Sequence, residues 1–328
     1  MEIENYTTKS VADAIRRYDG VKRKQAIGKL VNRFKLDCND VIASYGEDAA
    51  VIKKDNIALL LASDGIWNKL MDINPYWAGY CSILVNIHDI AAMGGQPIAI
   101  VNIISAMNDE YLTKISQGMQ DASSIFGVPI VGGHLHPDAP YNSIDVSILG
   151  TTELENVIYS SKSNPGDTII VAIDLNGRVH PSSPLNWDSV TMKTPKILRD
   201  QIAVMKDIGK NHYVTSGKDI SNPGIIGTLG MMIESSHIGA TVDLTAIPHP
   251  DLKKHGITFE QWTCMYPGMG FIMTAKPENI NIICKKFSDV GMTTKIIGST
   301  NNSKQLTLVK GNDKTTLFDF SKEGITNI

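Results

Sequence analysis

The stretch INPYWAGYCSILVNIHDIAAMGG, residues 73–95, decides how the rest of the sequence is interpreted. It predicts a helix over residues 75–93, because a proline suits the first turn and two glycines follow the last. The residues of this predicted helix are mostly apolar on all of its sides, so the helix is expected to be buried. Asp89 is the only charged residue from position 73 to position 108. A buried carboxylate is costly unless it is paired or binds a cation, so Asp89 requires such a partner.

Two further aspartates border apolar segments. Asp48 precedes the segment Ala-Ala-Val-Ile at 49–52, and Asp64 closely follows the apolar run at 57–62. Folding would bring these carboxylates together with Asp89, and each has little charge nearby in the sequence to pair with. Three such carboxylates indicate a site for a hard cation, and Mg²⁺ is the expected ion. The alternative for each aspartate by itself is a turn or capping role.

Length and composition narrow the class of protein. The chain has 328 residues, more than one core usually organises, so two domains of similar size are expected. With 42% hydrophobic and 20% charged residues and a net charge of -3, it has the composition of a soluble protein without a nucleic-acid surface. The sequence contains no recognisable signal peptide or membrane-spanning stretch, and its four separated cysteines suit a reducing compartment. We therefore predict a cytoplasmic protein with no nucleic-acid or membrane partner.

The order of predicted elements is mixed α+β rather than a run of regular βαβ units. The turn-rich segment Ser-Lys-Ser-Asn-Pro-Gly-Asp at 161–167 predicts a boundary between domains 1–160 and 161–328. The first domain is predicted to contain helices at 11–18, 26–34, 75–93 and 110–126 and strands at 49–53, 57–62, 97–104, 128–131 and 143–151. The second is predicted to contain helices at 190–208, 224–235 and 278–287 and strands at 168–174, 240–244, 270–274, 294–297 and 305–309.

Polar residues beside these elements are candidates for a ligand site. Asn86 lies three residues before Asp89, so both are expected on one side of the helix, where their oxygens suit Mg²⁺. A satisfied buried amide is the alternative for Asn86. His88 is expected to be a hydrogen-bonded core or interface histidine rather than a ligand. Lys22, Arg23 and Lys24 form a basic cluster that would clamp a triphosphate if this segment folds over the site. A solvated charged turn is the alternative.

Two glycine-containing segments are further candidates. In Gly-Gly-His-Leu-His-Pro-Asp at 132–138, Gly133 permits close backbone approach to a ligand, and His134 is placed to contact a phosphate or a metal-bound water. A zinc site of His134 with His136 would need further ligands, and a turn role is expected for His136. In Gly-Lys-Asp-Ile-Ser-Asn-Pro-Gly at 217–224, the start of the next helix offers N–H groups to an anion.

Within this second segment, Ser221 or Asn222 is positioned to cap the helix. Together with Asp219 they indicate a substrate or phosphate site, with a plain cap as the alternative. The chain contains neither the Walker phosphate-binding loop nor the His-Arg-Asp signature of protein kinases. ATP would therefore bind without a Walker loop.

A family resemblance is carried by five motifs, in order along nearly the whole chain: GEDAA at 46–50, ASD at 62–64, VNIHDIAAMGG at 85–95, GGH at 132–134 and DISN at 219–222. They resemble the aminoimidazole ribonucleotide synthetase superfamily, which includes thiamine-monophosphate kinase and selenophosphate synthetase. The resemblance implies a two-domain fold in which the N-terminal domain dimerises through a shared β-barrel and the C-terminal domain is an α+β sandwich. It also implies a homodimer with ATP in the cleft between the domains and Mg²⁺ as a cofactor.

The same resemblance implies roles for individual residues. Four residues of the first domain would bind the metal ions that bridge the ATP phosphates, namely Asp48, Ser63, Asp64 and Asp89. Three residues of the second domain would reach the metal or the substrate, namely Asp219, Ser221 and Asn222. The chain departs from the kinase motifs at His134 and Asn222, where the kinase has aspartates. These departures argue against thiamine-monophosphate kinase activity and for fewer or weaker metal sites.

A closer resemblance is to an archaeal branch named for methanogenesis markers, carried by segments at 78–80, 132–138, 177–181, 185–187 and 217–224. It implies a methanogen cytoplasm. We predict ATP- and Mg²⁺-dependent phosphoryl transfer to, or activation of, a small-molecule acceptor in methanogen cofactor or enzyme maturation. Asp48, Asp64 and Asp89 would be the catalytic residues, and Arg178 and Trp187 would recognise a planar or anionic acceptor.

Two other functions are compatible with the same residues. The first is a non-catalytic nucleotide-binding maturation factor that docks with a methanogenesis enzyme, which the departures at His134 and Asn222 favour. The second is a metallohydrolase built on His134 and His136, which would require a bound transition metal.

Overall fold

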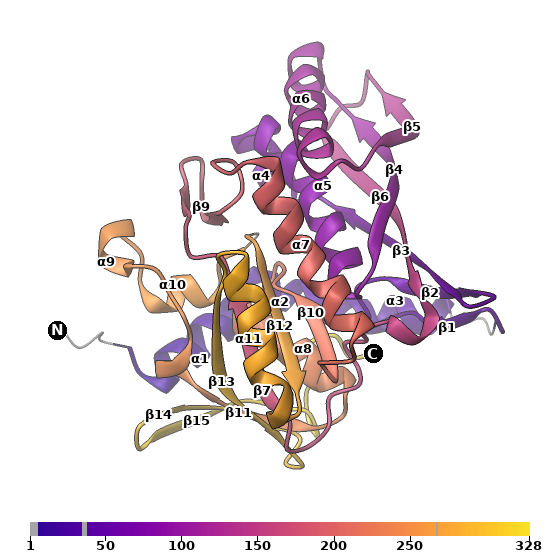
Figure 1. Cartoon of the computed structure of the whole chain (residues 1–328). Coiled ribbons are helices and arrows are strands. Elements are labelled where there is room, and N and C mark those ends of the chain that lie inside the picture. The colour runs from indigo at the N-terminus through magenta and orange to yellow at the C-terminus, as the bar shows by residue number, and fades with distance from the viewer. Residues whose placement is uncertain (1–5, 35–37, 267) are drawn as a thin grey trace.

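Two large β-sheets, one in each half of the chain, organise the part of the molecule that the structure describes (Figure 1). The computed structural model describes residues 6–34, 38–266 and 268–328. In these residues no helix is long and apolar enough to cross a membrane.

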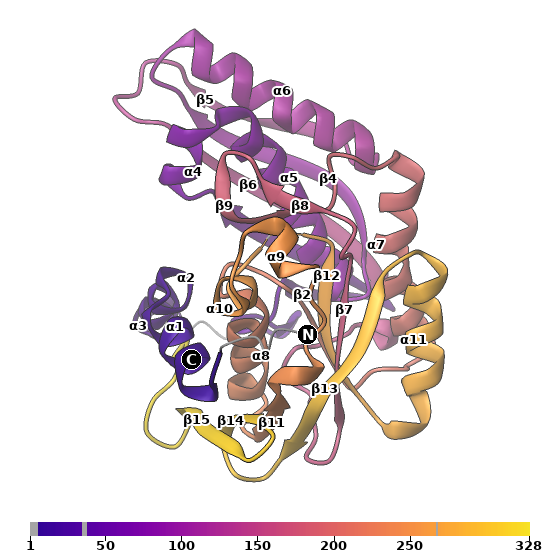
Figure 2. The same cartoon turned by 90° about the vertical axis from the view of Figure 1, so that its left-hand side faces the viewer.

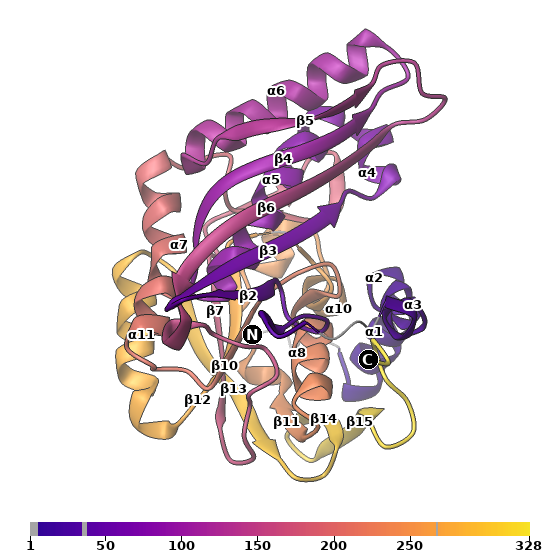
Figure 3. The same cartoon turned by 90° about the vertical axis from the view of Figure 1, so that its right-hand side faces the viewer.

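The first sheet has six strands in the order β1-β2-β3-β6-β4-β5, and only β4 and β5 pair in parallel. Helices α5 and α6 lie on one face, and Figure 3 views the opposite face, which no helix of the described residues covers. The elements of this half are β1 (Val41–Ala43), β2 (Ala50–Lys54), β3 (Ile57–Gly65), α4 (Asn68–Ile73), α5 (Pro75–Ala92), β4 (Gln96–Ser105), α6 (Asp109–Phe126), β5 (Ile130–His136), β6 (Ser143–Glu153) and η2 (Leu154–Asn156).

Helix α5 is the central element of the first half, as the sequence predicts. The side chain of Asn74 caps its start by accepting a hydrogen bond from the N–H of Trp77 at 3.0 Å. Its side chains are buried along almost its whole length. It packs closely against α6, because a Cβ added at Gly79 would lie 2.1 Å from the carbonyl oxygen of Ile115, and one at Gly118 would lie 2.0 Å from that of Tyr76. Glycine at both positions thus fixes how near the two helices approach.

The second sheet has seven strands in the order β10-β12-β7-β13-β11-β14-β15, with β11 and β14 parallel. Alternate residues of its strand β7 belong to different cores: Ile170 and Ala172 pack with α5, α7 and α11, whereas Ile169 and Val171 pack with α1 and α8. Its elements are β7 (Thr168–Ile173), α7 (Pro195–Lys210), β10 (Ser216–Asp219), α8 (Gly224–Ser235), β11 (Gly239–Asp243), η3 (Leu244–Ala246), α9 (Leu252–His255), α10 (Phe259–Thr263), β12 (Gly270–Ala275), η4 (Pro277–Asn279), α11 (Ile280–Asp289), β13 (Thr293–Asn301), β14 (Gln305–Lys310), β15 (Asp313–Asp319) and the hairpin β8 (Arg178–His180) with β9 (Ser183–Asp188).

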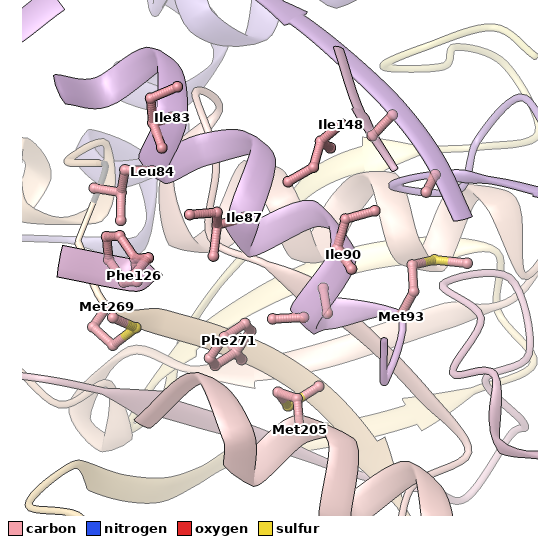
Figure 4. Packing of buried hydrophobic residues seen from close by; sticks show 14 of the residues in the cluster. Ile83, Leu84, Ile87, Ile90, Met93, Phe126, Ile148, Met205, Met269 and Phe271 are labelled. Atoms are coloured by element: carbon pink, nitrogen blue, oxygen red, sulfur yellow. The ribbon is translucent and has the colours of Figure 1, made fainter. Parts of the chain in front are cut away.

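One hydrophobic core spans both halves of the chain. Figure 4 shows Ile87 and Ile90 of α5 beside Phe271 of β12, with Met205 of α7 below them. Because α5 contacts elements of both sheets, it holds the two halves of the chain in one relative position. The division at residues 160 and 161 stays a prediction.

The N-terminal helices pack against the second half rather than the first, beside α8 and close to the C-terminal residues (Figure 2). They are α1 (Thr8–Arg17), α2 (Asp19–Lys22), η1 (Arg23–Ala26) and α3 (Ile27–Phe34). The N–H of Gly28 donates to the carbonyl of Thr326 at 2.9 Å, which joins the two ends of the chain.

Two predicted elements differ from the structure. The strand predicted at 128–131 runs further, as β5, and contains the two glycines; a Cβ at Gly133 would lie 2.4 Å from the carbonyl oxygen of Asn102 in β4, so glycine allows close strand packing there. The helix predicted from residue 190 begins only at Pro195, because the carboxylate of Asp188 accepts from the N–H groups of Val190 and Thr191 and holds a turn.

Candidate functional site

Helix α5 brings Asp89 to a large cavity lined by both halves of the chain. The cavity has a volume of about 1390 Å³. On α5 it is lined by Cys81, Val85 and Asp89, which are four residues apart and lie along one side of the helix. Asn86 is not among the lining residues. Its Nδ2 donates to the carbonyl of Ser82 at 2.8 Å. The expectation that Asn86 and Asp89 face the same cavity is therefore wrong for Asn86.

Three aspartates meet in this cavity. Asp48, just before β2, Asp89 of α5 and Asp219, the last residue of β10, each offer one carboxylate oxygen, and these oxygens lie within 4.8 Å of one another. The sequence prediction treated Asp48 and Asp89 as partners and placed Asp219 there by resemblance alone. The three-dimensional arrangement therefore joins one residue of the second half to two of the first.

Asp64 borders the same cavity from β3. Ala58, Leu60 and Ala62 are buried on the side of β3 that faces α5, and the alternation of a strand puts Asp64 on that side as well. Its side chain is open to the cavity rather than enclosed by protein. Asp64 is thus beside the three-aspartate group but is not one of its members.

The electrostatics of the group call for a cation. Burial raises the pKa of Asp89 well above its usual range, and the charges of Asp64, Asp219 and Asp48 raise it further. Burial and the charge of Asp48 raise the pKa of Asp219 to about 8. Within the described residues, Asp48 Oδ2 and Asp219 Oδ1 are buried without a hydrogen-bond partner. Oxygen atoms that lack donors and repel one another fit a divalent cation such as Mg²⁺.

Lys218 is a residue of this site that the sequence prediction missed. Its Nζ bonds to Asp48 Oδ1, and the side chains of the pair are 6% and 3% exposed. Burial alone would lower the pKa of Lys218, but Asp48, Asp219 and Asp89 outweigh this effect and raise it, so the ammonium is charged. The signal was a lysine directly before Asp219, but neighbouring residues of a strand usually face opposite sides, so the sequence alone does not place both side chains in one site.

The basic N-terminal segment reaches the cavity in part. Arg23 and Lys24 line it, whereas Lys22 is exposed outside it. The guanidinium of Arg23 lies 5.5 Å from the centre of the Trp67 ring, which orients it. A Cβ added at Gly20 would lie 2.4 Å from the carbonyl oxygen of Asn222, so this segment is folded tightly onto the loop after β10.

Ser221 and Asn222 also line the cavity, next to Asp219. Neither side chain caps α8: the residue before the helix is Pro223, and no side-chain capping bond forms there. The predicted capping of α8 by Ser221 or Asn222 is therefore not seen in the described residues. The side chains of Ser221 and Asn222 both lie at the cavity wall.

Several predicted residues have other partners or lie elsewhere. Ser63 does line the cavity, but its hydroxyl donates to the carbonyl of Val146 at 3.0 Å and accepts from Ser147, so it is hydrogen-bonded to β6. Gly133 and His134 lie on β5, at the opposite edge of the sheet from β1 and three strands away from β3. Within one chain these two residues do not line the cavity.

The remaining acceptor and zinc candidates have structural explanations. Trp187 is buried, and its indole N–H donates to the carbonyl of Asp174 at 2.9 Å, so it cannot recognise an acceptor in the cavity. Arg178 bonds to Asp188 at 3.2 Å in the same hairpin. The rings of His134 and His136 are 4.7 Å apart, but no third metal-ligating side chain joins them in the described residues.

Several solved structures share this fold. PurL of Thermotoga maritima, complexed with ADP, matches with a TM-score of 0.78 at 17% identity, over 98% of this chain and 52% of that chain. AaThiL complexed with AMPPCP and TMP matches with a TM-score of 0.65 at 18% identity, over 88% and 95% of the two chains. A HypE–HypF complex matches with a TM-score of 0.67 at 18% identity, over 90% and 99%. This chain thus spans about half of PurL, and shares its two-domain α+β fold.

Sequence comparisons give the family. Models of the N-terminal and C-terminal domains of AIR synthase related proteins match residues 46–152 and 157–311. An uncharacterized protein of Methanocaldococcus jannaschii is 45% identical over 322 residues, 97% of this chain and 98% of that one. One of Synechocystis is 35% identical over 281 residues, 86% and 85% of the two chains. The chain belongs to the AIR synthase-related family.

Proposed function

We propose that this protein is an enzyme that uses ATP and Mg²⁺ to transfer a phosphoryl group to a small-molecule acceptor, or to activate it. The observation that carries this proposal is the group of three carboxylates within 4.8 Å of one another in a cavity that Arg23 and Lys24 also line. A volume of about 1390 Å³ exceeds the roughly 300–1,000 Å³ of a typical small-ligand pocket, so a nucleotide and an acceptor fit together.

The proposed roles follow from position. Asp48, Asp89 and Asp219 hold Mg²⁺, with Asp64 at the border of the site, and the ion supplies neutralisation of the charge that develops on the phosphates. Arg23 and Lys24, which line the same cavity, bind phosphate oxygens.

The acceptor binds beside the phosphates in this proposal. Ser221 and Asn222 offer a hydroxyl and an amide at the cavity wall without a capping duty to satisfy. They orient the acceptor by hydrogen bonds next to Asp219. Positioning of this kind, rather than a covalent step on the protein, supplies much of the catalysis of phosphoryl transfer.

We also propose a homodimer that closes the first sheet into a shared barrel. The helix-free face of this sheet exposes large apolar side chains, namely Leu61, Val101, Ile103 and Leu149. Apolar patches of this extent mark interaction surfaces. On β5, His134 pairs with Ile103 at this face, and in this proposal Gly133 and His134 contact nucleotide only in the dimer. Val101→Arg is expected to give a monomer in analytical ultracentrifugation, and an unchanged mass would refute the interface.

The function is tested by measuring Mg²⁺-dependent ATP binding and ADP formation in Asp89→Asn. Asparagine keeps the size of the side chain but removes the charge that holds the cation, so both signals are expected to vanish while the fold is retained. Asp289→Asn, which changes an exposed aspartate on α11 paired with Lys285, is the control and should behave as the wild type. Unchanged ATP turnover in Asp89→Asn would refute the assignment. A thermal-shift screen with Mg²⁺-ATP and methanogen cofactor intermediates then identifies the acceptor class.

A second candidate is a cytoplasmic maturation factor that binds nucleotide without turning it over. It is favoured by the structural relatives that were solved as assemblies, HypE–HypF and PurLQS. We propose that either function serves methanogen cofactor or enzyme maturation; the 45% identical relative is an uncharacterized protein of Methanocaldococcus jannaschii. Tight Mg²⁺-ATP binding without ADP formation, together with a protein partner in pull-downs, would favour this function over the enzyme.

A further inference from the structure

A lysine inside a group of aspartates that is proposed to hold a cation needs an explanation. Lys218 is 5% exposed, and its ammonium bonds to one oxygen of Asp48. The other oxygen of Asp48 has no hydrogen-bond partner among the described residues. The ammonium therefore occupies one side of the carboxylate and leaves the other side available.

The charges show why the lysine alone does not complete the site. The carboxylates of Asp48, Asp64, Asp89 and Asp219 face two ammonium groups, the buried one of Lys218 and that of Lys24 at the cavity wall, which leaves a formal charge of −2 on these six groups when all are ionised. An isolated buried ion pair would instead be neutral, as Lys193 and Asp174 are in their own pair elsewhere in the second half. The surplus of acids means that Lys218 shares its surroundings with a further cation rather than replacing it.

We propose that Lys218 is a built-in cation of the nucleotide site: in the free protein it neutralises Asp48 and weakens metal binding, and in the loaded protein it contacts a phosphate oxygen. This inference rests on the proposed function. An ammonium and a divalent cation that share Asp48 repel each other, so the free protein binds metal weakly. The triphosphate supplies the negative charge that allows both cations to be close. Metal and nucleotide therefore bind together rather than in sequence.

The test measures Mn²⁺ binding to the nucleotide-free protein, with free Mn²⁺ detected by electron paramagnetic resonance. Lys218→Met removes the ammonium but keeps an unbranched side chain. Mn²⁺ is expected to bind at least about tenfold more tightly. The reason is that the repulsion energy between a divalent ion and an ammonium in contact, even with the dielectric constant of water, is larger than the free energy of a tenfold change in affinity. In the same variant, ATP with Mn²⁺ is expected to bind at least about tenfold more weakly, because a contact to a phosphate is lost.

Two further variants separate this role from a merely structural ion pair. Lys218→Gln keeps an N–H donor for Asp48 without the charge, so it provides the measurement if Lys218→Met does not fold. It is expected to show the same gain in Mn²⁺ affinity. Lys193→Met breaks a buried pair away from the cavity, where Lys193 bonds to Asp174 at 2.5 Å, and is expected to lose stability with Mn²⁺ affinity unchanged.

The outcomes distinguish the two proposals. If the wild type binds ATP with Mn²⁺ but both Lys218 variants keep the Mn²⁺ affinity of the wild type within twofold, Lys218 is only a structural partner of Asp48 and this inference is overturned. If the wild type binds neither Mn²⁺ nor ATP with Mn²⁺, the proposed function fails and this inference fails with it.

Discussion

Asp219 makes the stability of the metal-free protein depend on pH in an unusual direction. Burial and Asp48 raise its pKa to about 8 in the folded protein, whereas an aspartate of the unfolded chain ionises near pH 4, about 3.9 in model peptides. Between these two pH values the folded state binds the extra proton. The contribution of Asp219 to stability is therefore fully present below about pH 4 and is lost as the pH rises through about 8.

The magnitude follows from the fraction of Asp219 that keeps its proton. Integrated from pH 6 to pH 8, the free energy of unfolding falls by about 2 kcal/mol for this one group. For a protein of this size that corresponds to a fall in Tm of roughly 4 °C. Asp219→Asn removes the titrating group, so its Tm is expected to fall less than that of the wild type over the same range.

The assay is differential scanning calorimetry of the wild type and Asp219→Asn at pH 6, 7 and 8 in the presence of EDTA. Asp289→Asn should retain the wild-type slope, because this exposed carboxylate lies far from the cavity on α11. Mg²⁺ should flatten the wild-type slope, since it favours the ionised carboxylate. Parallel Tm curves for the wild type and Asp219→Asn, or a wild-type Tm that rises from pH 6 to pH 8, would refute the reasoning.

Two further predictions concern α5 and its neighbours. Burial lowers the pKa of His88 to about 4, so the free energy of unfolding falls as the pH drops below about 6.5, the usual pKa of a histidine in an unfolded chain. His88→Leu removes this titration and should lose about 2 kcal/mol less than the wild type between pH 7 and pH 5. Urea unfolding measures the two losses, and equal losses would contradict this reasoning. Gly118→Ala places a Cβ 2.0 Å from a backbone carbonyl oxygen of α5 and should destabilise the protein by about 1–3 kcal/mol. Gly132→Ala, whose Cβ would have its nearest atom at 3.8 Å, is the control, and equal effects of the two changes would show that helix contact is not the cause.

The sequence predicted the parts of the site that lie on regular elements beside apolar residues. Asp89 in an apolar helix, and Asp48 and Asp64 next to apolar strands, are each visible as charges without local partners. They do line one cavity. The position of Asp219 required a family resemblance, because nothing local indicates that β10 approaches α5.

The misplaced candidates share a different cause. Asn86 was assigned to the site because it lies three residues before Asp89. The residues of α5 that line the cavity are instead spaced by four. Packing of α5 against β3 and α6 decides which of these two rows of residues faces the cavity, and the sequence does not show that packing. Trp187 and Arg178 are residue types that recognise ligands, yet here an indole N–H and a guanidinium satisfy a backbone carbonyl and the carboxylate of Asp188. Residue type alone does not distinguish a free donor from a satisfied one.

The same helix that holds the core together also carries the acid of the site, and this combination explains how a buried charge is tolerated. Ile87 and Ile90 lie on either side of Asp89 in sequence and pack into the core shared by both halves, while Asp89 itself turns to the cavity with Val85. The close contact at Gly79 limits how far α5 can slide along α6. A shift of one residue would turn Asp89 into the core, where no cation reaches it. The apolar packing of α5 therefore fixes the position of the carboxylate, and the carboxylate, in turn, needs the lysine and the cation that the second half brings to it.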